Sequence, residues 1–219
     1  MIWPHARVCS CVSIEQRGLH GRSGLLVAPE NLNMLNRLAT LEEIEQAVWL
    51  ELRRASHDKH HEWRTPVLAT VDGSDAAGVW PDARTVVLRE VDINAKELVI
   101  YSDSRTAKAQ QLSRHPAAVL VFWSTRLGWQ LRCRAGCLIE TDGPAVSSRW
   151  QRIRQSASAR DYLSALAPGT PLETPSGPTQ CESFAAVTAR IERIDWLELH
   201  RDGHRRAVFG KPAAQWVQP

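Results

Sequence analysis

The chain has 219 residues, of which 43% are hydrophobic and 23% charged, as in a globular protein that buries a core. The formal net charge is only +3, and the basic residues are scattered, so nucleic-acid binding is not expected. No apolar run approaches the roughly 18 residues of a membrane span, and the N-terminus lacks the apolar core of a secretory signal. These features predict a cytoplasmic protein without a membrane anchor.

The cysteines predict neither a zinc site nor a disulfide framework. They lie at Cys9, Cys11, Cys133, Cys137 and Cys181. Cys133 and Cys137 fall in one predicted strand, where their Cα atoms would be about 13 Å apart, too far for a bridge. We expect free thiols in a reducing compartment.

Residues 1–39 show no hydrophobic period and are expected to form a poorly ordered leader. The clear pattern begins just after Met34, so one hypothesis is that translation starts there. Residues 40–219 are then expected to form a single domain.

A helix is predicted over residues 41–56. Thr40 and Glu43 have the spacing of a capping box, and apolar residues recur with helical period behind it. His57, His60 and His61 follow, beside acidic residues, and could ligate a metal. Their spacing matches no zinc motif, so a solvated helix end is the favoured interpretation and no metal is predicted.

The rest of the chain is mainly β, with flanking helices over 106–114 and 144–155. Strands are predicted over 66–72, 83–91, 97–103, 117–124, 129–140, 184–199 and 204–209. Their short spacing favours an antiparallel sheet that closes into a small barrel. Residues 167–180 are rich in Pro and Gly, which predicts an irregular loop of the kind that often serves as a lid.

Cations and polar groups gather at strand ends in the block 84–136, an arrangement that suits a phosphorylated, planar cofactor. They are Arg84, Arg89, Tyr101, Ser102, Lys108, Gln130 and Arg132. Arg89 and Lys108 could neutralise a phosphate, helped by the amides that open helix 106–114. Gln130 could bond the polar edge of the ring. Arg84 and Arg89 are five apart, so in a regular strand they face opposite sides unless a bulge intervenes.

From about Trp49 to Trp216 the chain resembles the pyridoxamine 5'-phosphate oxidase family. The strand Arg84–Arg89, the pair Tyr101–Ser102, Lys108 and Gln130 are similar to that family's flavin-binding residues and keep their order. The resemblance implies an FMN-binding split β-barrel that works as a homodimer, with FMN between the subunits. Arg89 and Lys108 would hold the FMN phosphate and Gln130 would contact the ring.

The residues that would recognise the substrate depart from the family's pattern. Where the family has a Tyr-x-x-x-Arg pair, this chain has Trp150 and Arg154; its C-terminal Arg-x-His-Asp-Arg motif is also absent. Arg154 and Arg205 are the candidate substrate-binding residues, and no residue is assigned a catalytic role. The resemblance is therefore to a divergent subfamily rather than to the vitamin B6 enzyme.

The resulting expectation is an FMN-dependent oxidoreductase acting on an unidentified small molecule. The alternative is a flavoprotein without turnover, such as a flavin store, a sensor or an electron-transfer partner. A third reading keeps the barrel but replaces the ligand with a deazaflavin or a haem, for which His115 and His204 are the candidate axial ligands.

Overall fold

The computed structural model describes residues 37–73, 78–171 and 182–219. The expectations for the leader fall mostly outside these ranges, and so does the proposed start at Met34. Residues 38–219 form one compact unit. None of the helices in the described ranges has the length and apolar character needed to cross a membrane.

Helix α1 (Leu41–His57) begins where the capping box predicts. Thr40 Oγ1 accepts a hydrogen bond from the Glu43 amide at 3.2 Å, and Glu43 Oε2 accepts one from the Thr40 amide at 3.0 Å. Both satisfy donors that the first helical turn leaves unpaired. The helix buries Ile44, Val48 and Leu52 completely, which ties it to the sheet, and a short 3-10 helix, η2 (Glu62–Arg64), follows.

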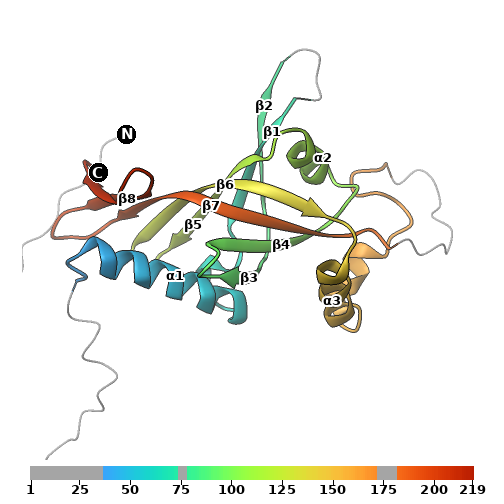
Figure 1. The fold of residues 1–219 in the computed structure, drawn as a ribbon, viewed down its shortest axis with the longest axis horizontal. Helices are drawn as coiled ribbons and strands as arrows, with labels where there is room; N and C mark the ends of the chain where they lie inside the picture. The colour runs from blue at the N-terminus through green and yellow to red at the C-terminus, as the bar shows by residue number, and fades with distance from the viewer. Residues whose placement is uncertain (1–36, 74–77, 172–181) are drawn as a thin grey trace, which may run out of the picture. The chain divides into compact units, whose positions relative to one another are not determined.

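An antiparallel sheet of nine strands forms the body of the unit, as the strand pattern predicts. The strands are β1 (Val67–Asp72), β2 (Trp80–Thr85), β3 (Leu88–Asp92), β4 (Glu97–Asp103), β5 (Ala117–Ser124), β6 (Trp129–Glu140), β7 (Phe184–Glu198), β8 (Arg205–Gly210) and β9 (Gln215–Val217). Their order is β2-β1-β5-β6-β7-β4-β3, with β8 paired to β7 and β9 to β8. The long strands β6 and β7 run through the centre of Figure 1.

The prediction of one strand over 83–91 is wrong. The chain leaves β2, which pairs with β1, and enters β3, which pairs with β4 at the other end of the strand order. Val86 lies between the two strands, and its amide bonds the Pro66 carbonyl at 2.9 Å. A register shift between Leu88 and Glu90 then places a bulge at Arg89. Arg84 and Arg89 therefore belong to different parts of the sheet.

Two further helices lie where the sequence predicts them. Helix α2 (Ala107–Arg114) is capped by Thr106, and α3 (Pro144–Ile153) ends two residues before the predicted boundary. A 3-10 helix, η3 (Ala157–Tyr162), was not predicted. Most of the predicted 167–180 loop lies outside the described residues, so its role as a lid stays a prediction.

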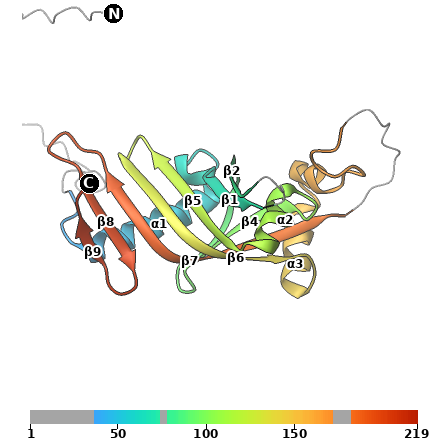
Figure 2. The same cartoon turned by 90° about the horizontal axis from the view of Figure 1, so that it is seen from above.

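The two faces of the sheet differ in what covers them. One face of β5, β6 and β7 packs against α1 in a cluster that includes Phe122, Leu131, Cys133 and Cys137. Figure 2 looks onto β5 to β8 with α1 behind them. Cys133 and Cys137 are free and buried, which confirms the prediction of unpaired thiols for these two. A second cluster joins β4 and β7 to α3 and η3.

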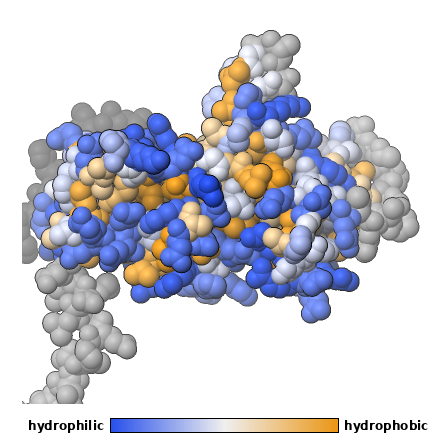
Figure 3. All heavy atoms as spheres, in the orientation of Figure 1, coloured by the Kyte–Doolittle hydropathy of each residue, from blue (hydrophilic) through white to orange (hydrophobic). Residues whose placement is uncertain are grey.

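Several large apolar side chains remain exposed on β1, β2, β5 and β6. The exposed fractions are 39% for Val67, 60% for Trp80, 44% for Trp123 and 60% for Leu138. Figure 3 shows hydrophobic residues along the arm that β1 and β2 form. Exposed apolar surface of this kind is typical of a face that another molecule covers.

Candidate functional site

One group of the predicted residues lies where β4 ends and α2 begins. Ser102 Oγ is 3.0 Å from Thr106 Oγ1, and the Thr106 side chain caps the helix by accepting the Ala109 amide. Lys108 lies in the first turn. Burial lowers the pKa of Lys108, and the nearby Arg84 guanidinium lowers it further, while Asp103 acts in the opposite direction. The site therefore holds two cations close together at a helix N-terminus.

Arg84 is held in this position by a polar network. Its Nη1 donates to Thr70 Oγ1 at 2.5 Å, and its Nη2 donates to Gln111 Oε1 at 3.1 Å. Its guanidinium also pairs with Asp82, and Gln111 Nε2 donates to the same carboxylate at 2.9 Å. Thr70 and Gln111 are buried, so the network links β1, β2 and α2 and fixes the direction of the guanidinium.

A second group, Arg89 and Tyr101, lies on the other face of β4. Successive residues of a strand point to opposite faces, so Tyr101 faces α3 while Ser102 faces α2. The Arg89 guanidinium lies over the Tyr101 ring, 5.7 Å from its centroid, and also interacts with the Tyr162 hydroxyl. The structure thus makes Arg84, rather than Arg89, the cationic neighbour of Lys108.

A hollow of about 380 Å³ opens beside Arg89 and Tyr101. Arg64 lines it as well, with two hydrogen bonds to the carbonyls of Ala55 and Ser56. Burial lowers the pKa of Arg64, and the charge of Arg89 lowers it further. Two neighbouring guanidiniums on one hollow favour an anionic ligand.

Glu90 organises the wall of this hollow. The Tyr101 hydroxyl donates to Glu90 Oε1 at 2.6 Å, and Arg152 and Arg149 donate to the same carboxylate at 2.9 and 3.1 Å. Burial raises the pKa of Tyr101 well above its ordinary value, and the bond to Glu90 raises it further. Tyr101 therefore stays a neutral phenol whose hydroxyl donates a hydrogen bond to Glu90.

Gln130 lies far from both groups within one chain. It pairs with Leu197 of β7, whereas Tyr101 pairs with Ala186. Eleven residues of strand separate these two positions, or about 36 Å. On β5 the cross-strand neighbour of Gln130 is Trp123, whose side chain is exposed.

The two candidate substrate residues do not meet at the Arg89 hollow. Arg154 is the exposed C-cap of α3. Arg205 bonds Glu198 at 2.8 and 3.1 Å and the Leu38 carbonyl at 2.6 Å. Its guanidinium also lies 5.6 Å from the ring centroids of Trp196 and Trp216. These contacts give Arg205 a place in the packing of β7, β8 and β9.

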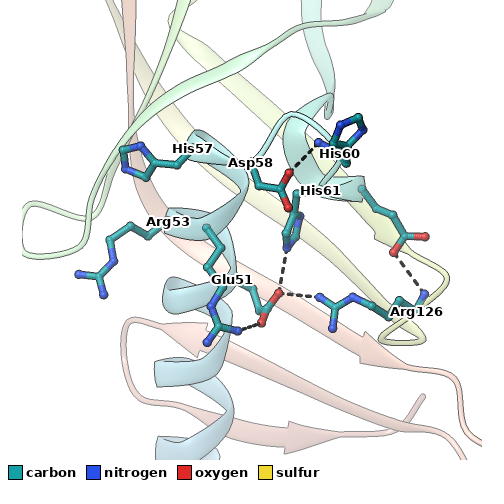
Figure 4. A pocket seen from close by; sticks show the side chains of 9 residues that line it. Glu51, Arg53, His57, Asp58, His60, His61 and Arg126 are labelled. Atoms are coloured by element: carbon teal, nitrogen blue, oxygen red, sulfur yellow. Dashed lines mark hydrogen bonds and ion pairs between the residues drawn. The ribbon is translucent and has the colours of Figure 1, made fainter. Parts of the chain in front are cut away.

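His57, the last residue of α1, and His60 and His61 after it line another hollow of about 780 Å³. Figure 4 shows His57, His60 and His61 pointing in different directions. His61 Nδ1 accepts the Trp63 amide at 3.1 Å, so Nε2 carries the proton that is donated to Glu51 Oε2 at 2.9 Å. Among the described residues no metal-binding cluster occurs. The candidate haem ligands His115 and His204 are both exposed.

Sequence reasoning missed the residues that surround Arg89. Arg149 and Arg152 lie in the predicted helix but outside the apolar stripe of Val146, Trp150 and Ile153, and Arg64 lies in the unpredicted η2. The only available signal was the charge of the residues, which does not say which strand a helix will cover. Arg149 and Arg152 reach Glu90 because α3 packs against β4 and β7.

Comparison with known proteins agrees with this architecture. Residues 46–140 match the family described as pyridoxamine 5'-phosphate oxidase, FMN-binding domain. The pyridoxine/pyridoxamine 5'-phosphate oxidase of Caulobacter vibrioides NA1000 is 36% identical over 91 residues, which cover 42% of this chain and 40% of that protein. The same-named protein of Azorhizobium caulinodans is 34% identical over 94 residues, covering 43% and 42%. The alignments thus span about two fifths of these curated relatives.

Solved structures show the same fold over most of the chain. A pyridoxamine 5'-phosphate oxidase-related, FMN-binding protein from Nostoc punctiforme superposes with a TM-score of 0.64 at 22% identity, covering 84% of this chain and all of that one. PhzG from Burkholderia lata 383 gives 0.61 at 13% identity, covering 81% and 92%. The expected mainly β fold with flanking helices is confirmed as a split β-barrel, and the expected cofactor is confirmed as FMN through the matched domain. Residues 46–140 of this chain thus match the FMN-binding domain of the pyridoxamine 5'-phosphate oxidase family, and the chain is similar in sequence to oxidases of that name over about two fifths of their length.

Proposed function

We propose that this protein is an FMN-dependent oxidoreductase that acts on a small anionic molecule and works as a homodimer. The observation that carries the proposal is the pair of adjacent cations, Arg84 and Lys108, at the N-terminus of α2 in a chain with an FMN-binding domain. FMN supplies the hydride or electron transfer when it is bound. The protein has to hold the phosphate, present the ring and position the substrate.

The residues at the start of α2 fit the FMN phosphate. The phosphate carries nearly two negative charges, which suits Lys108 together with Arg84, whose guanidinium already shares Asp82, and the first-turn amides lack partners within the helix. Lys108 makes no ion pair within the described part of the chain, although its ammonium lies near Arg84. We therefore assign the phosphate to Arg84, Lys108 and the Ser102–Thr106 corner, and place Arg89 elsewhere in the site.

The homodimer follows from the position of Gln130. If Gln130 meets the ring while Ser102 lies at the phosphate, the twelve residues of β7 between their partners Leu197 and Ala185, about 40 Å of strand, separate the two contacts in one chain, too far for one mononucleotide. A second copy that brings its Gln130 to the first copy's phosphate site removes the conflict. The exposed Trp123 beside Gln130 and the exposed Val67 and Leu138 are suited to cover by that copy.

The substrate class follows from the Arg89 hollow. Arg64 and Arg89 present guanidinium groups to a space of about 380 Å³ that Glu90 and Tyr101 border. Guanidinium forks bind phosphate and carboxylate groups in two-point contacts. In our proposal these groups orient an anionic substrate, and the Tyr101 hydroxyl, held by Glu90, helps to position it.

The positions of Arg154 and Arg205 favour a second candidate function, an FMN-binding protein without turnover. Arg154 is exposed, and Arg205 is engaged by Glu198 and two tryptophan rings. A store or electron-transfer protein would need the phosphate site but no substrate contacts.

Titration of the purified protein with FMN, followed by flavin fluorescence, tests the proposal. Arg84→Gln and Lys108→Gln should each weaken FMN binding by about 1.5–3 kcal/mol, roughly tenfold to a hundredfold, because each removes a charge-assisted contact. Arg114→Gln is the control, since Arg114 is exposed in the last turn of the same helix. Lack of flavin uptake by the wild type would contradict the whole proposal.

Anaerobic reduction of the bound flavin by B6 phosphates or nicotinamide donors separates the oxidoreductase from an FMN-binding protein without turnover. The oxidoreductase should show reduction of its flavin by such a donor, and the protein without turnover should not.

A further inference from the structure

A carboxylate lies in the Ser102–Thr106 corner that we assign to the FMN phosphate. Asp103 is the last residue of β4, and its side chain is only 2% exposed. Its charge acts on the Lys108 ammonium, because it raises the pKa of Lys108 against the effect of burial. A carboxylate that acts on Lys108 should also repel a phosphate bound to Lys108, and compete with it for the same cation. The charge of Asp103 therefore works against the proposed ligand.

Arg105 engages both oxygens of this carboxylate. The Arg105 amide and Nε donate to Asp103 Oδ1 at 2.8 and 3.1 Å, and Nη2 donates to Oδ2 at 2.7 Å. A two-point contact of this kind is the strong and directional form of a guanidinium–carboxylate pair. Among the described residues Asp103 forms its ion pair with Arg105 and none with Lys108. The negative charge of Asp103 is thus balanced inside the corner, and Lys108 is left to an outside anion.

The same guanidinium also holds the backbone that follows η3. Nη2 of Arg105 donates to the Ser164 carbonyl at 2.8 Å, and Nη1 donates to the Ala165 carbonyl at 3.3 Å, with a longer bond from Nη2 to the Leu166 carbonyl at 3.4 Å. These acceptors are neutral, so they fix the direction of the guanidinium without opposing its charge. A lysine ammonium lacks the planar fork that meets a carboxylate and several carbonyls together. The contacts therefore set the position of the ion pair from both sides.

We infer that Arg105 is a positioning residue for the FMN phosphate, which neutralises Asp103 and holds it away from Lys108. The inference rests on the proposed function, because it needs the phosphate at the start of α2. Arg105 acts through Asp103 and not by a contact of its own with the ligand. Without Arg105, Asp103 is a buried anion with Lys108 as its neighbouring cation, and it takes the place of the phosphate.

Fluorescence titration of the full-length chain with FMN tests the inference. Arg105→Gln should bind FMN about tenfold or more weakly than the wild type, because the Asp103 carboxylate loses its partner. Asp103→Asn/Arg105→Gln should return to within about threefold of the wild-type affinity, because the repelling charge has been removed together with its partner. Asp103→Asn alone should bind FMN at least as tightly as the wild type. Arg114→Gln makes the same change in net charge as Arg105→Gln and should leave the affinity unchanged.

The double variant separates this role from the other roles open to Arg105. If Arg105 only held the backbone of 164–166, or contacted the phosphate itself, Asp103→Asn could not restore binding, because the double variant still lacks the guanidinium. A double variant as weak as Arg105→Gln therefore overturns the inference, and so does wild-type affinity in Arg105→Gln. Urea midpoints show whether each variant folds. Should Arg105→Gln fail to fold, the double variant and Asp103→Asn still decide: equal affinities support the inference, and a weaker double variant overturns it.

Failure of the proposed function gives a different pattern. Unchanged FMN affinity in Lys108→Gln would place the phosphate away from this corner and overturn the site together with the role of Arg105. A loss of affinity in Lys108→Gln without one in Arg105→Gln leaves the phosphate site standing and overturns the role of Arg105 alone.

Discussion

At the scale of single residues, the partner of a charged group decides its role more than its identity does. Arg205 on β8 and Arg134 on β6 are both arginines of the central sheet, yet Arg205 is held by Glu198 and two tryptophan rings while Arg134 lies opposite another arginine on β7. The sequence assigned Arg205 to a substrate and gave Arg134 no role. The contacts give Arg205 a role in packing, whereas Arg134 has no ion pair within the described part of the chain.

Glu51 is the buried carboxylate with the most partners near α1. It accepts hydrogen bonds from His61 at 2.9 Å, Arg126 at 2.8 Å and Arg54 at 2.5 Å, as Figure 4 shows. Burial would raise its pKa, but these partners outweigh it and keep the pKa below the ordinary value of 4.5. Glu51 thus joins α1 and η2 to the turn between β5 and β6.

Glu51→Gln should lower the free energy of unfolding at neutral pH by about 1–3 kcal/mol, because the ionised partner of His61 and Arg126 is lost. The stabilisation is complete above pH 4.5 and is lost as the pH falls through the lowered pKa of the folded state. The difference from the wild type should therefore shrink in acid. Urea unfolding at neutral and acidic pH measures it, with Glu45→Gln, an exposed partner of Lys96 on the same helix, as control. A difference that grows in acid would contradict this account.

At the scale of elements, the turn between β5 and β6 is clamped from two sides. Glu62 accepts the amides of Thr125 and Arg126 at 3.0 and 3.2 Å. On the other side, the Gly128 carbonyl accepts the Leu199 amide at 2.8 Å. The clamp matters because Gln130, the residue proposed to meet the flavin ring, follows two residues later.

Gly128 adopts a φ of 65°, and a Cβ added there would lie 2.7 Å from the Leu199 carbonyl oxygen. Gly128→Ala should therefore destabilise the protein by about 1–3 kcal/mol, through backbone strain and a forced movement of Leu199. Gly203→Ala separates the two effects, since Gly203 has a φ of 105° but no atom near the added Cβ. Urea midpoints measure both variants. Equal losses of stability in Gly128→Ala and Gly203→Ala would show that the close approach to Leu199 contributes nothing.

At the scale of the whole molecule, our proposal requires two copies of the chain to combine before the proposed residues form a complete flavin site. Ser102, in the proposed phosphate corner, pairs with Ala185 near one end of β7, whereas Gln130 pairs with Leu197 near the other end and has Trp123 beside it on β5. The uncovered sheet face and the exposed apolar side chains of β1, β5 and β6 fit that arrangement.

Mixed dimers test the arrangement. A Lys108→Gln chain and a Trp123→Ala/Gln130→Ala chain should each bind FMN weakly as homodimers. Denaturing and refolding them together should create heterodimers in which one site combines the intact Lys108 of one copy with the intact Gln130 of the other. Fluorescence titration should then show tight sites, up to one for each heterodimer. If each chain carried its whole site, mixing would restore none.

By itself, the sequence determined the local structure and the cofactor. The capping box at Thr40, the helix that Lys108 opens and the alternation along β5 and β6 depend on neighbours in the chain, so their elements were predicted within a few residues. Only the tertiary structure decided which distant residues meet. Strand pairing separated Arg84 from Arg89, joined Arg84 to Lys108, and set Arg134 against Arg193, because register between strands depends on the packing of the whole sheet rather than on spacing within one strand.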